Sequence, residues 1–237
     1  MNMPLNTSAN TSDPIAQARY NMIEQQIRPW NVLDGDVLDL LAVVHREDFV
    51  PAAYRSMAFM DIEIPLVAGD AEEAVRLGQS MLQPRMEARM LQDLKVQPTD
   101  RVLEIGAGSG YMAALLAHRA ERVVSLEINP ALVSMARDNL RNAGIQNAEV
   151  RQADGARDTI ADGPFDVIVL SGSVAEVPSS LLALLRDGGR LGAIVGSEPV
   201  MRFSLTRRTG NRMETTAPWD TIAPRLLHFP EPSGFTF

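Results

Sequence analysis

From Arg101 onward, the chain alternates short apolar runs rich in β-branched residues with longer stretches of helical apolar spacing. This alternation is typical of parallel strands joined by crossover helices. The expected strands are 102–105, 122–126, 148–152, 165–170 and 190–195, and the expected helices are 111–119, 130–143 and 178–185. The run 165–170 is nearly all apolar, as expected for a central strand covered on both faces. A turn is expected at Asp187-Gly188-Gly189, and a hairpin from the weaker strand patterns 202–207 and 212–216.

The first part of the chain is helical in pattern rather than alternating. Helical apolar spacing covers 15–27 and 34–44; a proline ends the first stretch, and Asp34 can cap the second. The segment 58–79 has no sustained period and carries acidic residues, so we expect an exposed loop or short helix that acts as a lid. A further helix is expected at 84–94, where a proline occupies the first turn.

These patterns predict one domain with an appended helical part, because 237 residues can bury one good core. Residues 1–13 are polar and unpatterned, which predicts a disordered tail. The single domain is expected over 14–237. Its expected parts are a helical cap and lid at 14–95, a cofactor-binding core at 96–200 and C-terminal strands at 201–237.

Composition narrows the function classes. The net charge of −8 argues against a protein that binds nucleic acid by broad phosphate neutralisation. The absence of cysteine and the scatter of the three histidines argue against a metal site. No run approaches the roughly 20 apolar residues that span a bilayer, and the N-terminal residues lack a targeting pattern, so a cytoplasmic location without membrane contact is expected. A peptide or a small molecule is the expected substrate.

The strongest chemical signal is the run Glu104-Ile105-Gly106-Ala107-Gly108-Ser109-Gly110-Tyr111, which lies between an expected strand and an expected helix. Open α/β sheets bind ligands at such positions. A dinucleotide fingerprint would require its third glycine where Tyr111 stands, so the spacing disfavours NAD and FAD. An acid followed by Gly-x-Gly-x-Gly suits S-adenosylmethionine, which has a cationic amino acid end and no pyrophosphate. The alternative is a tight strand-to-helix connection without a ligand.

Two acids that follow the next strands fall on the same edge of the expected sheet. Glu127 closes the second strand, where a carboxylate can accept both ribose hydroxyls. Asp154 follows the third strand and is placed to accept from the adenine amino group. The alternative for each is a simple helix cap. Glu104 is an acid inside an apolar strand, so it needs a partner, and a cationic ligand would supply one.

Several segments carry a resemblance to a known family. They are VHREDFVP at 44–51, Asp61, GQSMLQP at 78–84, RVLEIGAGSGYMAALLA at 101–117, Asp154-Gly155, PFDVI at 164–168 and the stretch 185–195. With them the chain resembles protein-L-isoaspartate (D-aspartate) O-methyltransferases. The resemblance implies methyl transfer from S-adenosylmethionine to isoaspartyl carboxylates of damaged proteins or peptides. It also implies an α/β, Rossmann-like class I methyltransferase sheet of seven mostly parallel strands, with an altered C-terminal strand order.

The expected cofactor-binding residues are Glu104, Gly106, Ala107, Gly108, Gly110, Glu127, Ile128, Asp154 and Gly155. The acceptor side departs from the family. Where the family carries its active-site serine, this chain has Leu82, which cannot donate a hydrogen bond to an acceptor carboxylate. Ser80, two residues earlier, is the candidate substitute, or else the counterpart of a family threonine on the cofactor side.

Other acceptor-side candidates are weaker. Trp30, Tyr54 and Phe59 are candidates for an aromatic acceptor pocket, although aromatic residues in helices usually belong to the core. Arg85 is a candidate for pairing with an acceptor carboxylate. Two other functions remain open: a paralogue that methylates a different acceptor, and a catalytically silent protein that binds the cofactor.

Overall fold

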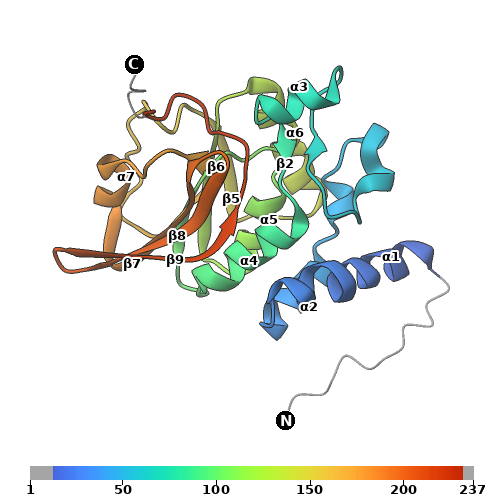
Figure 1. Cartoon of the computed structure of the whole chain (residues 1–237), viewed down its shortest axis with the longest axis horizontal. Helices are drawn as coiled ribbons and strands as arrows, with labels where there is room; N and C mark the ends of the chain where they lie inside the picture. The colour runs from blue at the N-terminus through green and yellow to red at the C-terminus, as the bar shows by residue number, and fades with distance from the viewer. Residues whose placement is uncertain (1–12, 232–237) are drawn as a thin grey trace, which may run out of the picture.

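The structure, a computed structural model, describes residues 13–231 and is built on one twisted seven-stranded sheet (Figure 1). Its strands are β3 (Arg101–Ile105), β4 (Arg122–Glu127), β5 (Ala148–Gln152), β6 (Phe165–Val174), β7 (Leu185–Ser197), β8 (Val200–Thr209) and β9 (Arg212–Thr221). Their order across the sheet is β5-β4-β3-β6-β7-β8-β9. The first five in that order are parallel, and the β8–β9 hairpin adds two antiparallel strands at one edge.

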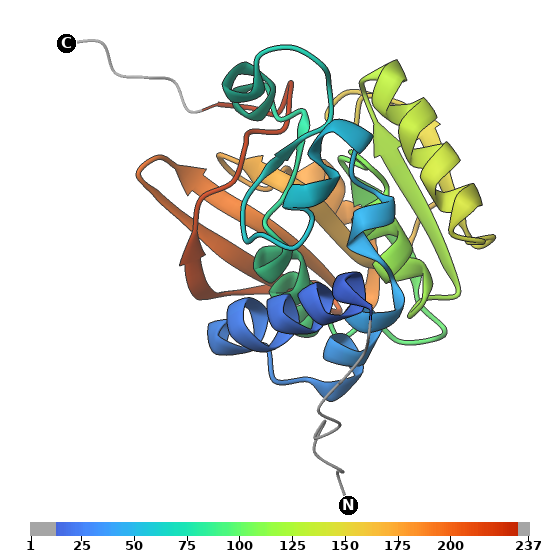
Figure 2. The same cartoon turned by 90° about the vertical axis from the view of Figure 1, so that its right-hand side faces the viewer.

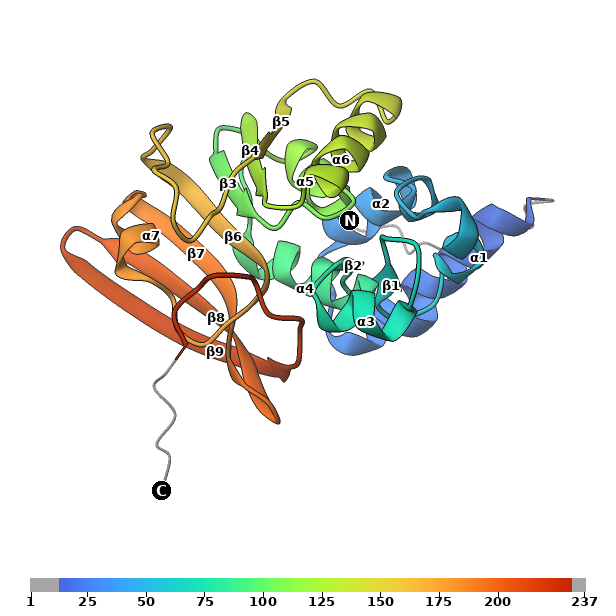
Figure 3. The same ribbon diagram turned by 90° about the horizontal axis from the view of Figure 1, so that it is seen from above.

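Helices cover both faces of the parallel part. They are α4 (Pro84–Leu94), α5 (Tyr111–Ala117), α6 (Pro130–Asn142) and α7 (Ser179–Ala183). Seen from above, α4, α5 and α6 lie on one side of the sheet and α7 lies on the other (Figure 3). Neighbouring residues of β3 therefore enter different cores: Val102 packs into the core on the α4–α6 side, and Leu103 into the core on the α7 side.

The N-terminal elements form a cap outside α4. They are α1 (Pro14–Met22), the π-helical turn Ile23–Ile27, the 3₁₀ turn Arg28–Trp30, α2 (Gly35–Val43), and the 3₁₀ turns Arg46–Asp48 and Ala52–Met57. Helix α2 contacts α4. The blue N-terminal helices lie on the same side of the sheet as α4 (Figures 1 and 2). Asp34 caps α2, as its position before the apolar spacing predicted, and Asp13 caps α1.

The segment without sustained period forms a small unit between the cap and the sheet. It contains β1 (Ile64–Pro65), α3 (Ala71–Arg76) and β2 (Ser80–Met81). Asp70 caps α3, so the acidic stretch is a short exposed helix. Strands β1 and β2 pair over only two residues each, Ile64 with Met81 and Pro65 with Ser80.

The expected strands and helices of the core are confirmed, with differences at their ends. The expected turn at Asp187-Gly188-Gly189 is wrong, because β7 runs through it from Leu185 to Ser197. The pairing with β6 changes register there, as in a β-bulge, and Gly188 takes the positive φ of 78° that this distortion needs. Strand β6 also continues past its apolar run to Val174.

The expected disordered tail, apart from Asp13, lies outside the described residues. Within 13–231, no helix combines the length and the apolar character that crossing a bilayer requires.

A buried arginine joins the C-terminal end of α4 to the sheet. Arg190 on β7 donates to the carbonyls of Leu94 and Lys95 at 2.6 and 2.7 Å. It also pairs with Asp100 at 2.7 Å, and the side chains of Arg190 and Asp100 are only 9% and 8% exposed.

Replacing this arginine will therefore destabilise the fold. We expect Arg190→Met to lower the free energy of unfolding by about 3–5 kcal/mol, because Asp100 is left buried and unpaired. The control is Arg202→Met, which breaks the exposed pair of Arg202 with Asp220 and should cost less than about 1 kcal/mol. Urea denaturation measures both, and equal losses would contradict the interpretation.

Candidate active site

A cavity of about 80 Å³ opens at the carboxyl ends of the parallel strands. It lies at β3, where the chain changes from adding strands on the β4 side to adding them on the β6 side. Open α/β sheets usually bind their ligands at such a point. Its wall contains Leu77, Gly78, Gln79, Ser80, Ile105, Gly106, Gly108, Leu126, Glu127, Ile128, Asn129, Leu132, Ala153, Asp154, Gly155, Ser171, Arg225, Leu226, Leu227 and Phe229.

The glycine turn forms the floor of this cavity. Gly106 and Gly108 have φ angles of 93° and 52°, which side chains rarely adopt, and both lie in the wall. Gly110 serves helix packing instead, since a Cβ there would lie 3.2 Å from the backbone of Ala136 on α6. Ala107 is buried behind the wall. The turn thus exposes bare backbone to a ligand at two of its three glycines.

Glu127 holds the turn in place. Its Oε2 accepts the Gly108 amide proton at 2.9 Å, and its Oε1 accepts that of Asn129 at 2.9 Å. Asn129, and not Glu127, caps α6, so the alternative of a simple helix cap is wrong for Glu127. Each carboxylate oxygen keeps a lone pair for a further donor, so this side chain can still accept two hydroxyls.

Asp154 follows β5, lies in the cavity wall and contacts a histidine. Its Oδ2 is 2.6 Å from Nδ1 of His228, and its Oδ1 accepts the Ala156 amide proton at 3.0 Å. Burial alone would raise the pKa of Asp154, but the His228 contact, the Ala156 amide and the charge of Arg157 outweigh it and lower this pKa. The carboxylate therefore stays an acceptor at neutral pH. No α-helix follows Asp154 directly, but its Oδ1 caps a single turn, in which the Asp158 amide donates to the Asp154 carbonyl at 2.8 Å.

Glu104 differs from the sequence-based expectation. It lies behind the cavity wall, fully buried, and its partners are two hydroxyls: Ser125 donates at 2.5 Å and Ser171 at 2.8 Å. Burial raises the pKa of Glu104 to about 7, against the lowering effect of both hydroxyls. The partners of this buried acid are therefore two side chains of the protein and not a ligand. Strand register places Ser125 beside Glu104, because the two residues pair across β3 and β4.

The two acceptor-side candidates separate in the structure. Ser80 lies in the cavity wall, and its buried Oγ makes no hydrogen bond within the described residues 13–231. Leu82 is 6% exposed and packs into the core. An unpaired hydroxyl beside a cavity is costly unless a ligand engages it, so Ser80 is the better placed of the two.

The other acceptor-side candidates lie elsewhere. Arg85 pairs with Asp61 at 2.8 Å, and its Cζ is 3.8 Å from the ring centroid of Trp30. Tyr54 and Phe59 pack against the core. Arg85 already has a carboxylate partner from the protein, so it is not poised for an acceptor.

The C-terminal strap, which we define as residues 223–229, is an element of the site that strand and helix patterns do not predict. It crosses the sheet in the view from above (Figure 3, dark red) and supplies Arg225, Leu226, Leu227 and Phe229 to the wall. Two backbone hydrogen bonds fix it to β6: Ser173 donates to Pro224 at 2.7 Å, and Leu226 donates to Ser173 at 2.9 Å.

The strap sets the size of the cavity. A Cβ on Gly106 would lie 3.0 Å from a methyl of Leu226, and one on Gly172 would lie 2.8 Å from it, so Leu226 fills the space between these glycines. The cavity is therefore smaller than the several hundred Å³ that a nucleoside-sized ligand usually occupies. Such a ligand fits the lining chemistry, and Leu226 limits the space left for it.

Comparison with known proteins places the chain in a family. A sequence model named protein-L-isoaspartate(D-aspartate) O-methyltransferase (PCMT) matches residues 17–221. The chain belongs to this family. A protein-L-isoaspartate O-methyltransferase of Koribacter versatilis is 35% identical over 198 residues, covering 84% of this chain and 85% of that protein. Its counterpart from Methanoculleus marisnigri is 38% identical over 205 residues, covering 86% and 89%.

Solved structures confirm the expected methyltransferase fold. A crystal structure of a Plasmodium falciparum protein, named as a member of the PCMT family and bound to S-adenosyl-L-homocysteine, has a TM-score of 0.73. It is 19% identical and covers 88% of this chain and 97% of that one. A second protein-L-isoaspartate O-methyltransferase has a TM-score of 0.72 at 23% identity, covering 87% of this chain and 65% of that one.

The raised pKa of Glu104 yields a prediction for stability. The folded protein holds a proton that the unfolded chain releases above its usual pKa of 4.5, so the free energy of unfolding falls between pH 4.5 and about 7. This contribution is at most about 1.4 kcal/mol per pH unit. Glu104→Gln lacks the titration, so the variant should gain stability relative to the wild type as pH rises from 5 to 7.

Urea denaturation at pH 5, 6 and 7 measures this difference. Glu214→Gln, a change of the same type at an exposed position on β9, serves as the control. The interpretation fails if the Glu104→Gln difference does not depend on pH.

Proposed function

We propose that the protein is an S-adenosylmethionine-dependent O-methyltransferase that acts on isoaspartyl carboxylates of damaged proteins or peptides. The observation that carries this is Glu127, which is bonded to the Gly108 amide of the Gly-x-Gly-x-Gly turn in a cavity at the switch point of the sheet. Membership of the PCMT family supports the same reaction. S-adenosylmethionine, when bound, supplies a methyl group already activated on a sulfonium.

The cavity offers a different partner to each end of this cofactor. The backbone at Gly106 and Gly108 would accommodate the amino acid end. Glu127 would accept the ribose hydroxyls, since its carboxylate is held by two amides and keeps lone pairs toward the cavity. Asp154 would accept from the adenine amino group, between the walls formed by Ile128 and Gly155. Glu104, behind the wall, supports this arrangement through Ser171, which lies in the wall.

On the acceptor side, we assign Ser80 as the orienting hydroxyl. Transfer of a methyl group to a carboxylate needs no general base, because the nucleophile is already ionised at neutral pH. Positioning then supplies most of the catalysis. The Ser80 Oγ has no hydrogen-bond partner within residues 13–231, so its proton is available to an acceptor carboxylate that reaches it, whereas Leu82 offers only an apolar contact. Ser80 thereby supplies the hydroxyl that the family's serine provides at position 82.

Methyl transfer from radiolabelled S-adenosylmethionine to an isoaspartyl peptide tests the function, with the aspartyl peptide as control. We expect transfer to the isoaspartyl peptide only. Calorimetric titration with S-adenosylhomocysteine separates the alternatives. Binding without transfer to either peptide would favour a different acceptor or a silent binding protein, and no binding would overturn the cofactor site itself.

The position of the family's serine gives a second prediction. Leu82→Ser should increase transfer to the isoaspartyl peptide, because it adds a donor on the same face of the extended segment as Ser80. Leu82→Ala is the matched control, since it removes a similar volume without adding a hydroxyl. Both variants should lose about 2–4 kcal/mol of stability from the core. Equal initial rates for the two folded variants would show that position 82 does not contact the acceptor.

A further inference from the structure

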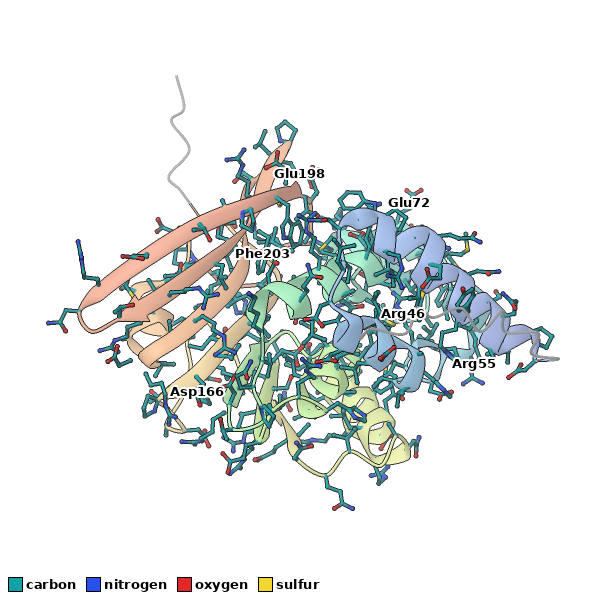
Figure 4. All side chains as sticks on the ribbon, turned by 90° about the horizontal axis from the view of Figure 1, so that it is seen from below. Arg46, Arg55, Glu72, Asp166, Glu198 and Phe203 are labelled. Carbon is teal, nitrogen blue, oxygen red and sulfur yellow. The ribbon has the colours of Figure 1, made fainter. Side chains whose placement is uncertain are left out.

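A fully buried arginine lies outside the cavity and has no role in the function proposed above. Arg46 is 0% exposed and belongs to the VHREDFVP segment, within the 3₁₀ turn Arg46–Asp48. Figure 4 places it among the N-terminal elements, far from the labelled Phe203 and Asp166 of the sheet. Arginine is almost never fully buried without partners, so its contacts indicate what it does.

The guanidinium spans two backbone carbonyls from different parts of the chain. Nη1 donates to the carbonyl of Ala58 at 2.9 Å, and Nη2 donates to that of Leu82 at 2.8 Å. Ala58 ends the 3₁₀ turn Ala52–Met57 of the cap, and Leu82 directly follows β2. A planar fork with fixed donor directions can hold two acceptors in one geometry, which a lysine ammonium cannot do in the same way.

An ordinary ion pair does not account for this arginine. Its nearest carboxylate is Glu87, whose Oε2 is 3.9 Å from Nε and makes no hydrogen bond within residues 13–231. Burial raises the pKa of Glu87, although Arg46 opposes the rise, so this carboxyl is a weaker counter-charge than an ordinary glutamate. A buried cation without a full counter-charge is a poor source of stability. The hydrogen bonds of Arg46 to the carbonyls of Ala58 and Leu82 are therefore its specific interactions.

The segment held by Arg46 carries the acceptor-side hydroxyl. Its Met81 and Leu82 side chains are buried in the core, but its backbone has few partners. Strand β2 pairs with β1 over only two residues, one of which is Ser80. The same segment abuts the glycine turn, since a Cβ on Gly108 would lie 4.0 Å from the Ser80 carbonyl oxygen. Arg46 also reaches the helix that follows this turn, with its Cζ 6.0 Å from the ring centroid of Tyr111. Arg46 thus lies between the segment that carries Ser80 and the helix that follows the glycine turn.

We propose that Arg46 is a positioning residue for methyl transfer: its fork fixes the Leu82 carbonyl and thereby places the Ser80 hydroxyl beside the cavity. This inference rests on the proposed function for its catalytic consequence, but the clamp itself does not. Displacing a reacting group by about 1 Å can cost on the order of 10²-fold in rate. A loosened clamp should therefore lower kcat while cofactor affinity stays near normal.

The clamp is tested first without any activity measurement. Amide hydrogen exchange, followed by mass spectrometry, is compared between the wild type, Arg46→Lys and Arg46→Met. We expect faster exchange at 64–66 and 79–83 in both variants and unchanged exchange in the β8–β9 hairpin. Arg46→Lys keeps the charge and most of the volume, so it serves where Arg46→Met is unstable. Unchanged exchange at 79–83 in Arg46→Lys would overturn the proposal.

The catalytic consequence is tested by steady-state kinetics with the isoaspartyl peptide. Arg46→Lys should lower kcat by about 10- to 100-fold, and its affinity for S-adenosylhomocysteine should change by less than about threefold. Glu87→Gln is the matched control, because it alters the same buried cluster without touching either carbonyl contact, and its kcat should equal that of the wild type. A parallel fall in kcat and cofactor affinity would indicate general destabilisation and overturn the positioning role.

A double-mutant cycle shows whether Arg46 acts through Ser80. In a Ser80→Ala background, Arg46→Lys should reduce kcat by much less than it does in the wild type, because the group it positions is already gone. Strictly additive effects would overturn the proposal. If the wild type transfers no methyl group while exchange at 79–83 still responds to Arg46→Lys, the proposed function fails and the clamp stands.

Discussion

Because β3 and β4 are parallel and pair residue for residue from Arg101 with Arg122 to Ile105 with Leu126, their backbones leave the sheet at the same level. The end of β4 therefore holds the turn after β3 by hydrogen bonds: the amides of Gly106 and Ala107 both donate to the Leu126 carbonyl. The next residue, Glu127, reaches back to the same turn. The shape of the cavity floor thus follows from strand register and would be lost if β4 slipped by one residue.

Register also explains how the sheet tolerates an acid in its core. Glu104 is held between hydroxyls on the strands at both sides, Ser125 on β4 and Ser171 on β6. Each hydroxyl satisfies one carboxylate oxygen, so burial costs less than it would for an isolated charge. Burial still holds the pKa near 7, so the group changes its protonation state close to neutral pH without any direct contact with solvent.

Much of the fold could be predicted from the sequence, because the signals were local. Apolar periodicity located α4 to the residue, and glycine spacing placed the turn at Gly106 and Gly108. Glu127 and Asp154 were found because acids at successive strand ends must meet at one edge of a parallel sheet. Their positions in the wall agree with those predictions, while their roles toward a cofactor stay predictions.

The parts that sequence reasoning missed depend on contacts between distant segments. The partners of Glu104 were assigned to a ligand because nothing local indicates that Ser125 and Ser171 face it. The Asp-Gly-Gly sequence of the bulge in β7 predicted a turn, because turns and bulges favour the same residues. The C-terminal strap has neither strand nor helix periodicity, and its position is set by contacts with distant residues, among them two backbone hydrogen bonds to Ser173 and the donation of Arg225 to the Gly196 carbonyl.

That strap has a consequence for the order of events in turnover. Leu226 fills the space over the glycine turn, and His228 contacts Asp154, so one short segment covers both ends of the cavity. A movement of this segment away from β6 would therefore open both ends of the cavity together. Lid opening of this kind limits the rate of many enzymes whose chemistry is fast. Such a movement would break the two main-chain hydrogen bonds at Ser173 together with the contacts of Arg225 with the Gly196 carbonyl and of His228 with Asp154.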